Sequence, residues 1–78
     1  MAACLPLVHI SAEQSAVISH VEGQDDRCMR LYELGFVPGS QVTLTNRIAF
    51  GGPMAFQIRG TKVALRREDA ACIYVQPV

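Results

Sequence analysis

A ten-residue run in the middle of the chain, residues 30–39, has the pattern of a short helix that stops at a glycine and leads into a turn. Leu31 and Leu34 recur at helical spacing, so the helix has an apolar face that we expect to join the core. Gly35 stands where a helix ends in a left-handed residue, and Phe36 follows it as the apolar contact of that cap. A proline and a glycine then preset a turn. The run predicts a short helix in a chain that is otherwise built of strands.

Two carboxylates, Asp25 and Asp26, mark the start of this helix. Either side chain is able to cap the free N–H groups of the first turn, and both favour the positive end of the helix dipole. We therefore expect the helix to run from about Asp26 to Leu34.

Short segments of alternating apolar and polar residues predict five strands around this helix. They span residues 16–21, 41–48, 54–59, 62–65 and 73–75. Gly60-Thr61 has the length of a two-residue hairpin link, and residues 66–71 have room for one helical turn before the last strand. Five short strands bury little surface as a flat sheet, so we expect a mostly β fold that curls into a small, partly open barrel. The helix, between the first and second strands, would close one end, and Phe56 should lie in the core.

Length and charge limit what this chain does. Its 78 residues suffice for one domain, and half of them are hydrophobic, which indicates a folded protein. Seven basic and seven acidic residues give a formal net charge of zero, and their scatter argues against a nucleic-acid partner. The low charge favours self-association, and a homodimer is one candidate form. The first seven residues lack Lys and Arg and are broken by Pro6, so we expect no secretory signal, no membrane insertion and a cytoplasmic location.

The three cysteines, Cys4, Cys28 and Cys72, show no CxxC spacing. An odd number of cysteines without that spacing argues against a disulfide framework and against a closed structural zinc site. We expect Cys28 and Cys72 to behave as small apolar core residues.

Four segments follow one another along the chain: RLYELGFVPG at residues 30–39, Gly-Gly-Pro at 51–53, GTKVALR at 60–66 and the A-x-x-I-x-V pattern that ends at Val75. In this order they resemble the FeoA family of small cytoplasmic proteins of bacterial ferrous iron uptake. The resemblance extends over residues 16–75 of the single domain, 1–78. It implies an SH3-like β-barrel, in agreement with the strand pattern. It also implies a role as partner of the large membrane GTPase-permease that carries ferrous iron.

The chain departs from this family at one place. The family often has a glycine turn just before the first strand, where this chain has Glu13-Gln14-Ser15. The same domain also occurs at the C-terminus of metal-dependent repressors, but the 78 residues leave no room for a helix-turn-helix.

No group of residues predicts catalysis. His9 and His20 lie far apart in the sequence, and no serine or cysteine stands in a recognisable nucleophile motif. The glycines at 51–53 lack the Lys-Ser/Thr of a phosphate loop, and a hairpin loop explains them better. We expect a non-enzymatic protein that requires no cofactor.

Two histidine–glutamate pairs are weak candidates for a metal site. His9 and Glu13 would share a face if their segment is helical, and His20 and Glu22 would share a face of a strand. Either pair, helped by Cys4 or by a second molecule, could hold an adventitious or regulatory divalent ion such as zinc or ferrous iron. The simpler interpretation is that these are solvated surface residues.

A docking surface is expected beside the helix. Barrels of the SH3 type capture proline-rich peptides on aromatic residues, often a Trp, and this chain has no Trp. We predict instead an apolar groove formed by Leu31, Tyr32, Phe36 and Val37, with Phe50 on a loop as a further contact. For Leu31 and Phe36 the simpler interpretation, that they seal the end of the barrel, is preferred. Tyr32 lies off the leucine stripe and is expected to be exposed.

Two functions remain open. The leading one is an interaction module that docks on the permease and tunes its GTP turnover or its assembly. The alternative is a metal-binding iron sensor or chaperone that uses the histidine, glutamate and cysteine ligands named above.

Overall fold

A computed structural model describes residues 4–23, 26–47 and 52–78 of the chain. The elements follow one another as β1 (Leu5–Pro6), the 3-10 helix η1 (Leu7–His9), β2 (Ser15–Val21), α1 (Asp26–Leu34), β3 (Gln41–Arg47), β4 (Met54–Ile58), β5 (Thr61–Leu65), α2 (Arg67–Ala70) and β6 (Ile73–Pro77). The helix α1 has the bounds that were predicted from the sequence, and α2 lies within the helical turn that was predicted at residues 66–71.

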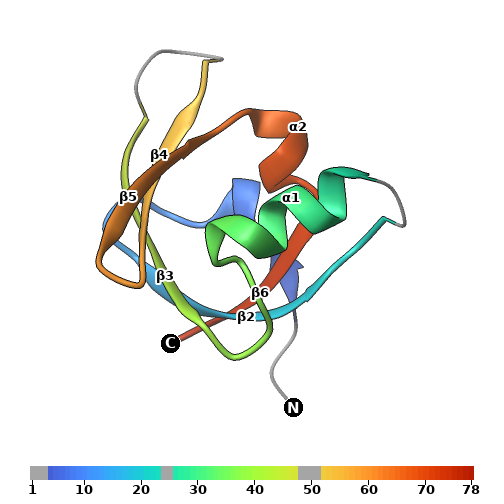
Figure 1. Cartoon of the computed structure of the whole chain (residues 1–78). Helices are drawn as coiled ribbons and strands as arrows, with labels where there is room; N and C mark the ends of the chain where they lie inside the picture. The colour runs from blue at the N-terminus through green and yellow to red at the C-terminus, as the bar shows by residue number, and fades with distance from the viewer. Residues whose placement is uncertain (1–3, 24–25, 48–51) are drawn as a thin grey trace.

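All six strands belong to one antiparallel sheet with the order β1-β6-β2-β3-β4-β5. The sheet curls around the core but does not close, because β1 and β5 are edge strands (Figure 1). Shifts in register after Ile18 and after Leu44 help it to curl, since an irregular residue increases the local twist of a strand. The SH3-like, mostly β fold and its partial opening are as predicted.

The core is filled by alternate residues of the strands together with the apolar face of α1. In β4 the side chains of Met54, Phe56 and Ile58 are buried, whereas Ala55 and Gln57 are not. Alternate burial follows from the two-residue period of a strand, which turns every second side chain toward the core. Phe56 lies in the core as predicted.

The N-terminal segment corrects the prediction of five strands. Leu5 pairs with Val75 and Pro6 with Tyr74, which makes β1 a sixth strand beside β6. Leu7 and Ile10 that follow are buried in the core. A two-residue strand with a proline has no alternating pattern to recognise, and it exists only because β6 provides a partner from the other end of the chain.

The end of α1 forms a Schellman cap, as the glycine predicted. The N–H of Phe36 donates to the carbonyl of Leu31 at 3.0 Å, and the N–H of Gly35 donates to that of Tyr32 at 3.0 Å. Gly35 has a φ of +110°, a conformation that side chains rarely adopt. Leu31 and Phe36 are both fully buried, so the cap also anchors the helix to the core.

The turn between β4 and β5 lies one residue earlier than the sequence suggested. Ile58 pairs with Thr61, so the link is Arg59-Gly60 and not Gly60-Thr61. Both link residues have a positive φ, 52° for Arg59 and 79° for Gly60, as a type I′ turn requires. Because Ile58 pairs directly with Thr61, only two residues form the link, and such a link favours a type I′ turn. Arg59 occupies the first position of this turn, where asparagine is preferred.

We expect Arg59→Asn to raise the free energy of unfolding by about 0.5–1 kcal/mol, because asparagine tolerates a positive φ better than arginine does. Chemical denaturation with and without the substitution measures the change. The matched control is Arg67→Asn in α2, where the backbone is helical. A stability that falls at residue 59 would contradict this interpretation of the turn.

Glu13 is the other non-glycine residue with a positive φ among the described residues, at 65°. It lies where the resemblance placed a glycine turn. The turn is therefore present, and here a glutamate adopts the conformation for which glycine is best suited.

Candidate functional site

A groove runs between α1 and the segment that joins β5 to α2. Its cavity volume is ≈ 320 Å³. Three positions of one helical stripe, at i, i+3 and i+7, form one wall, with the fully buried Leu31 behind them. We call it the α1–β5 groove, and its lining residues are Arg27, Arg30, Leu31, Leu34, Ala64, Leu65, Arg66, Glu68 and Asp69.

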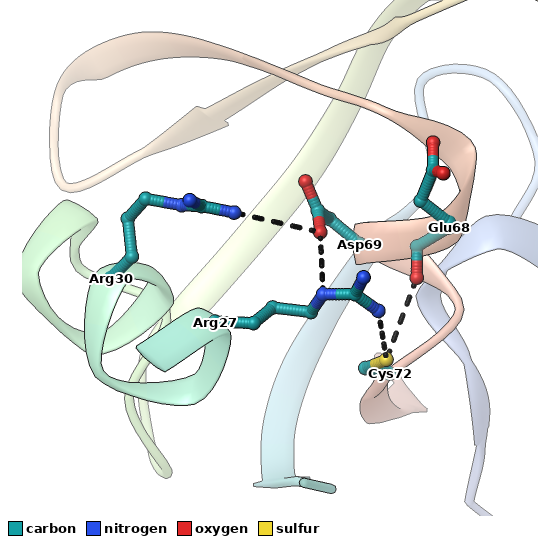
Figure 2. Close-up of polar contacts among 5 residues, drawn as sticks. All are labelled: Arg27, Arg30, Glu68, Asp69 and Cys72. Carbon is teal, nitrogen blue, oxygen red and sulfur yellow. Dashed lines mark hydrogen bonds and ion pairs between the residues drawn. The ribbon is translucent and has the colours of Figure 1, made fainter. Parts of the chain in front are cut away.

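The carboxylate of Asp69 joins the two helices across the groove (Figure 2). Its Oδ1 lies 3.2 Å from Nε of Arg27 and 4.0 Å from Nη2 of Arg30. The Asp69 side chain is only 12% exposed, whereas that of Arg30 is 63% exposed. A partly buried carboxylate is stabilised when it is paired, and here two guanidinium groups share a single negative charge.

The Cys72 thiol extends this polar cluster toward β6. Nη1 of Arg27 donates to Sγ of Cys72 at 3.6 Å, and that thiol donates to the carbonyl oxygen of Glu68 at 3.4 Å (Figure 2). Cys72 is half-buried and lies outside the core cluster, which corrects the expectation that it is a core residue. Its place directly after α2 gives the sulfur polar neighbours. Cys28, by contrast, packs against the core as expected.

The leucine stripe of α1 divides between the core and the groove. Leu31 is fully buried, but Leu34 is 43% exposed, so the prediction that Leu34 lies in the core is wrong. Leu34 is the last residue of the helix, and the chain turns away at Gly35 before any element covers it. An exposed leucine on a groove wall is available to a ligand.

A profile of the FeoA domain matches residues 5–77 of the chain. The chain belongs to the FeoA family. The resemblance seen in the sequence is thereby confirmed, and the matched region includes the N-terminal segment that the sequence patterns did not assign.

Known proteins of similar sequence or structure agree with this assignment. The chain is 37% identical over 70 residues to a fusion of Fe(2+) transport protein A with Fe(2+) transporter FeoB from Porphyromonas gingivalis; the match covers 90% of the chain but 8% of that relative's length. The crystal structure of Stenotrophomonas maltophilia FeoA with zinc, described as a prokaryotic SH3 domain protein, is 32% identical over 90% of this chain and 87% of that one, with a TM-score of 0.80. A manganese-dependent transcriptional repressor shares the fold alone, at 16% identity and a TM-score of 0.88, over 100% of this chain and 44% of the repressor.

Only part of the predicted docking surface is available at the surface of the protein. Tyr32 is 40% exposed, which confirms the expectation for this residue. Phe36 is fully buried and meets Phe56 edge to face at a centroid distance of 6.3 Å, so its inclusion in the docking surface is corrected. Val37 is half-buried, and Phe50 lies outside the described residues. For Leu31 and Phe36 the preferred interpretation, that they seal the barrel, is confirmed.

Tyr32 belongs to a different face of α1 from the groove stripe, since it does not line the groove. Hydrogen bonding with the Cys28 thiol, one turn earlier, raises the pKa of Tyr32 above its ordinary value. At neutral pH the Tyr32 phenol is protonated, as a tyrosine with an ordinary pKa also is, and it presents a neutral hydrogen-bonding group at the surface.

The candidate metal ligands are not gathered into one site in the described part of the chain. The helix expected to align His9 with Glu13 ends at His9, and both residues are exposed. Nε2 of His20 lies 3.9 Å from Oε2 of Glu22, but the His20 ring is stacked on Tyr74 at 4.9 Å. Among residues 4–23, 26–47 and 52–78, no three His, Cys, Asp or Glu side chains are grouped as metal ligands would be.

Cys4, the fifth candidate ligand, is exposed near the C-terminal strand, where it accepts a hydrogen bond from Nε2 of Gln76 at 3.8 Å.

Within the described ranges, no helix has the length and apolar character needed to cross a bilayer.

The charged residues of the groove were missed because the sequence patterns drew attention only to the apolar stripe of α1, which contains Leu31 and Leu34. A signal was present: Arg27, Arg30 and Leu34 have the spacing of one helical face. What the sequence could not provide was the second wall, since Arg66 and Asp69 approach α1 only through the path of β5 and α2.

Proposed function

We propose that this chain is a non-enzymatic accessory protein of bacterial ferrous iron uptake, which binds the membrane GTPase-permease from the cytoplasm and tunes its GTP turnover or assembly. One observation carries the proposal: in the Porphyromonas gingivalis relative, transport protein A and transporter FeoB are one polypeptide. Fusion places both at the same site in the cell and at high local concentration. A member of the family that is not fused has to achieve that proximity by binding.

The surface supports a binding function better than a catalytic one. The polar cluster around Asp69 consists of arginines and a carboxylate that hold two helices together. A binding protein of this kind acts on its partner by preferring one of its conformational states, and it shifts the equilibrium only as far as the two affinities differ. Binding near the GTPase part of the permease would thereby couple to GTP binding.

This coupling has a reciprocal form that tests the proposal. We expect the chain to change the affinity of the purified permease for a non-hydrolysable GTP analogue by about 5-fold or more, which is the lower range of typical allosteric coupling. By linkage, the analogue must change the permease's affinity for the chain by the same factor. Fluorescence titration measures both. The proposal would be contradicted if the chain does not bind the permease and if a large excess of the chain leaves the affinity for the analogue unchanged.

A second proposal, an iron sensor or chaperone, is kept because the Stenotrophomonas maltophilia relative was solved with zinc. Its ligands here would be His9, Glu13, His20, Glu22 and Cys4. Metal content of freshly purified protein and titration of dialysed protein with ferrous ion test it. Absence of ferrous binding below millimolar concentration would overturn this second proposal. Homodimer formation also remains a proposal, which sedimentation at several protein concentrations tests.

A further inference from the structure

The α1–β5 groove carries an excess of positive charge near its rim. Arg27 and Arg30 share the single carboxylate of Asp69, at 3.2 and 4.0 Å. Arg66 is exposed, and within the described residues it forms no ion pair. Glu68 supplies the only further carboxylate among the lining residues. The groove therefore has room for one more negative charge beside Arg30 and Arg66.

The same groove also exposes apolar side chains on both of its sides. Leu34 is 43% exposed there, and Ala64 and Leu65 line the opposite side. Covering the exposed part of Leu34 would remove apolar surface from water, which is favourable in proportion to the area buried. A volume of ≈ 320 Å³ accommodates a few side chains, which suits a short segment of a partner better than a large ligand.

We propose that this groove is the docking site for the permease, and that it binds a segment bearing a carboxylate side chain next to an aliphatic one. This inference rests on the proposed function and adds to it the surface and the chemistry of the partner. The carboxylate of the segment pairs with Arg66 and Arg30, and the aliphatic side chain covers Leu34. Arginine suits the first contact because its planar guanidinium binds a carboxylate through two hydrogen bonds.

The lining disfavours a polyanion as occupant. A nucleic acid or a polyphosphate would bring several negative charges against the carboxylates of Glu68 and Asp69, and it would leave the wall formed by Leu34 uncovered. A single carboxylate flanked by an aliphatic group complements the charged and the apolar side chains of the lining at once. Complementary charge also speeds the encounter of the two proteins and fixes the register of the bound segment.

Two substitutions separate the polar and apolar contacts. Arg66→Glu reverses the charge of an exposed residue, and we expect it to weaken binding to the purified cytoplasmic GTPase region by about 10- to 100-fold. Leu34→Gln keeps the size of the side chain but removes its apolar end, and we expect about a 5-fold loss. Calorimetric titration measures both affinities. Higher salt should weaken the wild-type complex more than the complex of Arg66→Glu.

Lys62→Glu provides the matched control. It makes the same change of charge at an exposed residue of β5 that does not line the groove. Lys62 lies four positions before Arg66, which corresponds to about 13 Å of extended chain and exceeds the screening length of about 8 Å at physiological salt. We expect the affinity of this variant to stay close to that of the wild type. Thermal unfolding of all three variants checks that the fold is retained.

The outcomes distinguish this inference from the function on which it rests. If the wild type binds and both groove variants bind equally well, the groove is not the docking site, although the proposed function stands. If the wild type binds neither the GTPase region nor the intact permease, both are overturned. Loss of affinity in Arg66→Glu and Leu34→Gln, with Lys62→Glu unchanged, supports the groove. Capture of a labelled RNA by the wild type instead of the permease would overturn it in favour of a polyanion.

Discussion

Replacing Leu7 with alanine is expected to lower the free energy of unfolding by about 2–5 kcal/mol, the usual cost of removing a buried leucine side chain. Leu7 is fully buried in the core, in the 3-10 helix directly after the edge strand β1. For a domain of this size such a loss lowers the melting temperature by about 10–30 °C. Thermal unfolding followed by circular dichroism measures it.

Leu34→Ala is the matched control for Leu7→Ala. It removes the same atoms from a side chain that is 43% exposed, so we expect a loss of only about 1 kcal/mol. The comparison tests whether the N-terminal segment belongs to the folded domain. Equal stability losses at both positions would contradict the burial of Leu7 that the structure describes.

The Phe36→Ala substitution is expected to cost about 3–5 kcal/mol, because it leaves a large cavity in a core that packs at high density. Phe36 is fully buried, it meets Phe56 edge to face with an interplanar angle of 86°, and its backbone closes the cap of α1. The change removes the core contacts of the side chain that holds the helix end against the core, although the backbone hydrogen bond of the cap is retained. Urea denaturation gives the difference in the free energy of unfolding.

Tyr32→Ala serves as the comparison for Phe36→Ala, since both remove an aromatic ring from the same region. Tyr32 is exposed, so we expect its loss to change stability by less than about 1 kcal/mol. A Phe36→Ala protein with normal stability but weakened binding to the permease would restore Phe36 to the docking surface. Weakened stability at Phe36 alone agrees with its place in the core.

The features predicted well from the sequence are those encoded locally. The end of α1 depends on Gly35 and on the two hydrogen bonds that close the cap within six residues, so the pattern around it suffices. The strands β2, β3 and β4 show the alternation that a half-buried strand requires. A curled sheet then follows, because short strands bury a core only when they wrap around it.

The features that were missed depend on partners distant in the sequence. The strand β1 is held by pairing with Tyr74 and Val75, near the other end of the chain. Helical spacing alone placed Leu31 and Leu34 together, but the core covers only Leu31. The groove likewise needs the contact between Arg27 on α1 and Asp69 on α2, which no local pattern contains.

Docking of this chain on the permease is best measured by calorimetric titration against the purified cytoplasmic GTPase region, with and without ferrous ion. We expect saturable binding whose affinity is the same in both conditions. Binding that occurs only with ferrous ion would contradict the docking account and favour the iron sensor. Absence of binding in both conditions, and to the intact permease as well, would contradict the proposed function as a whole.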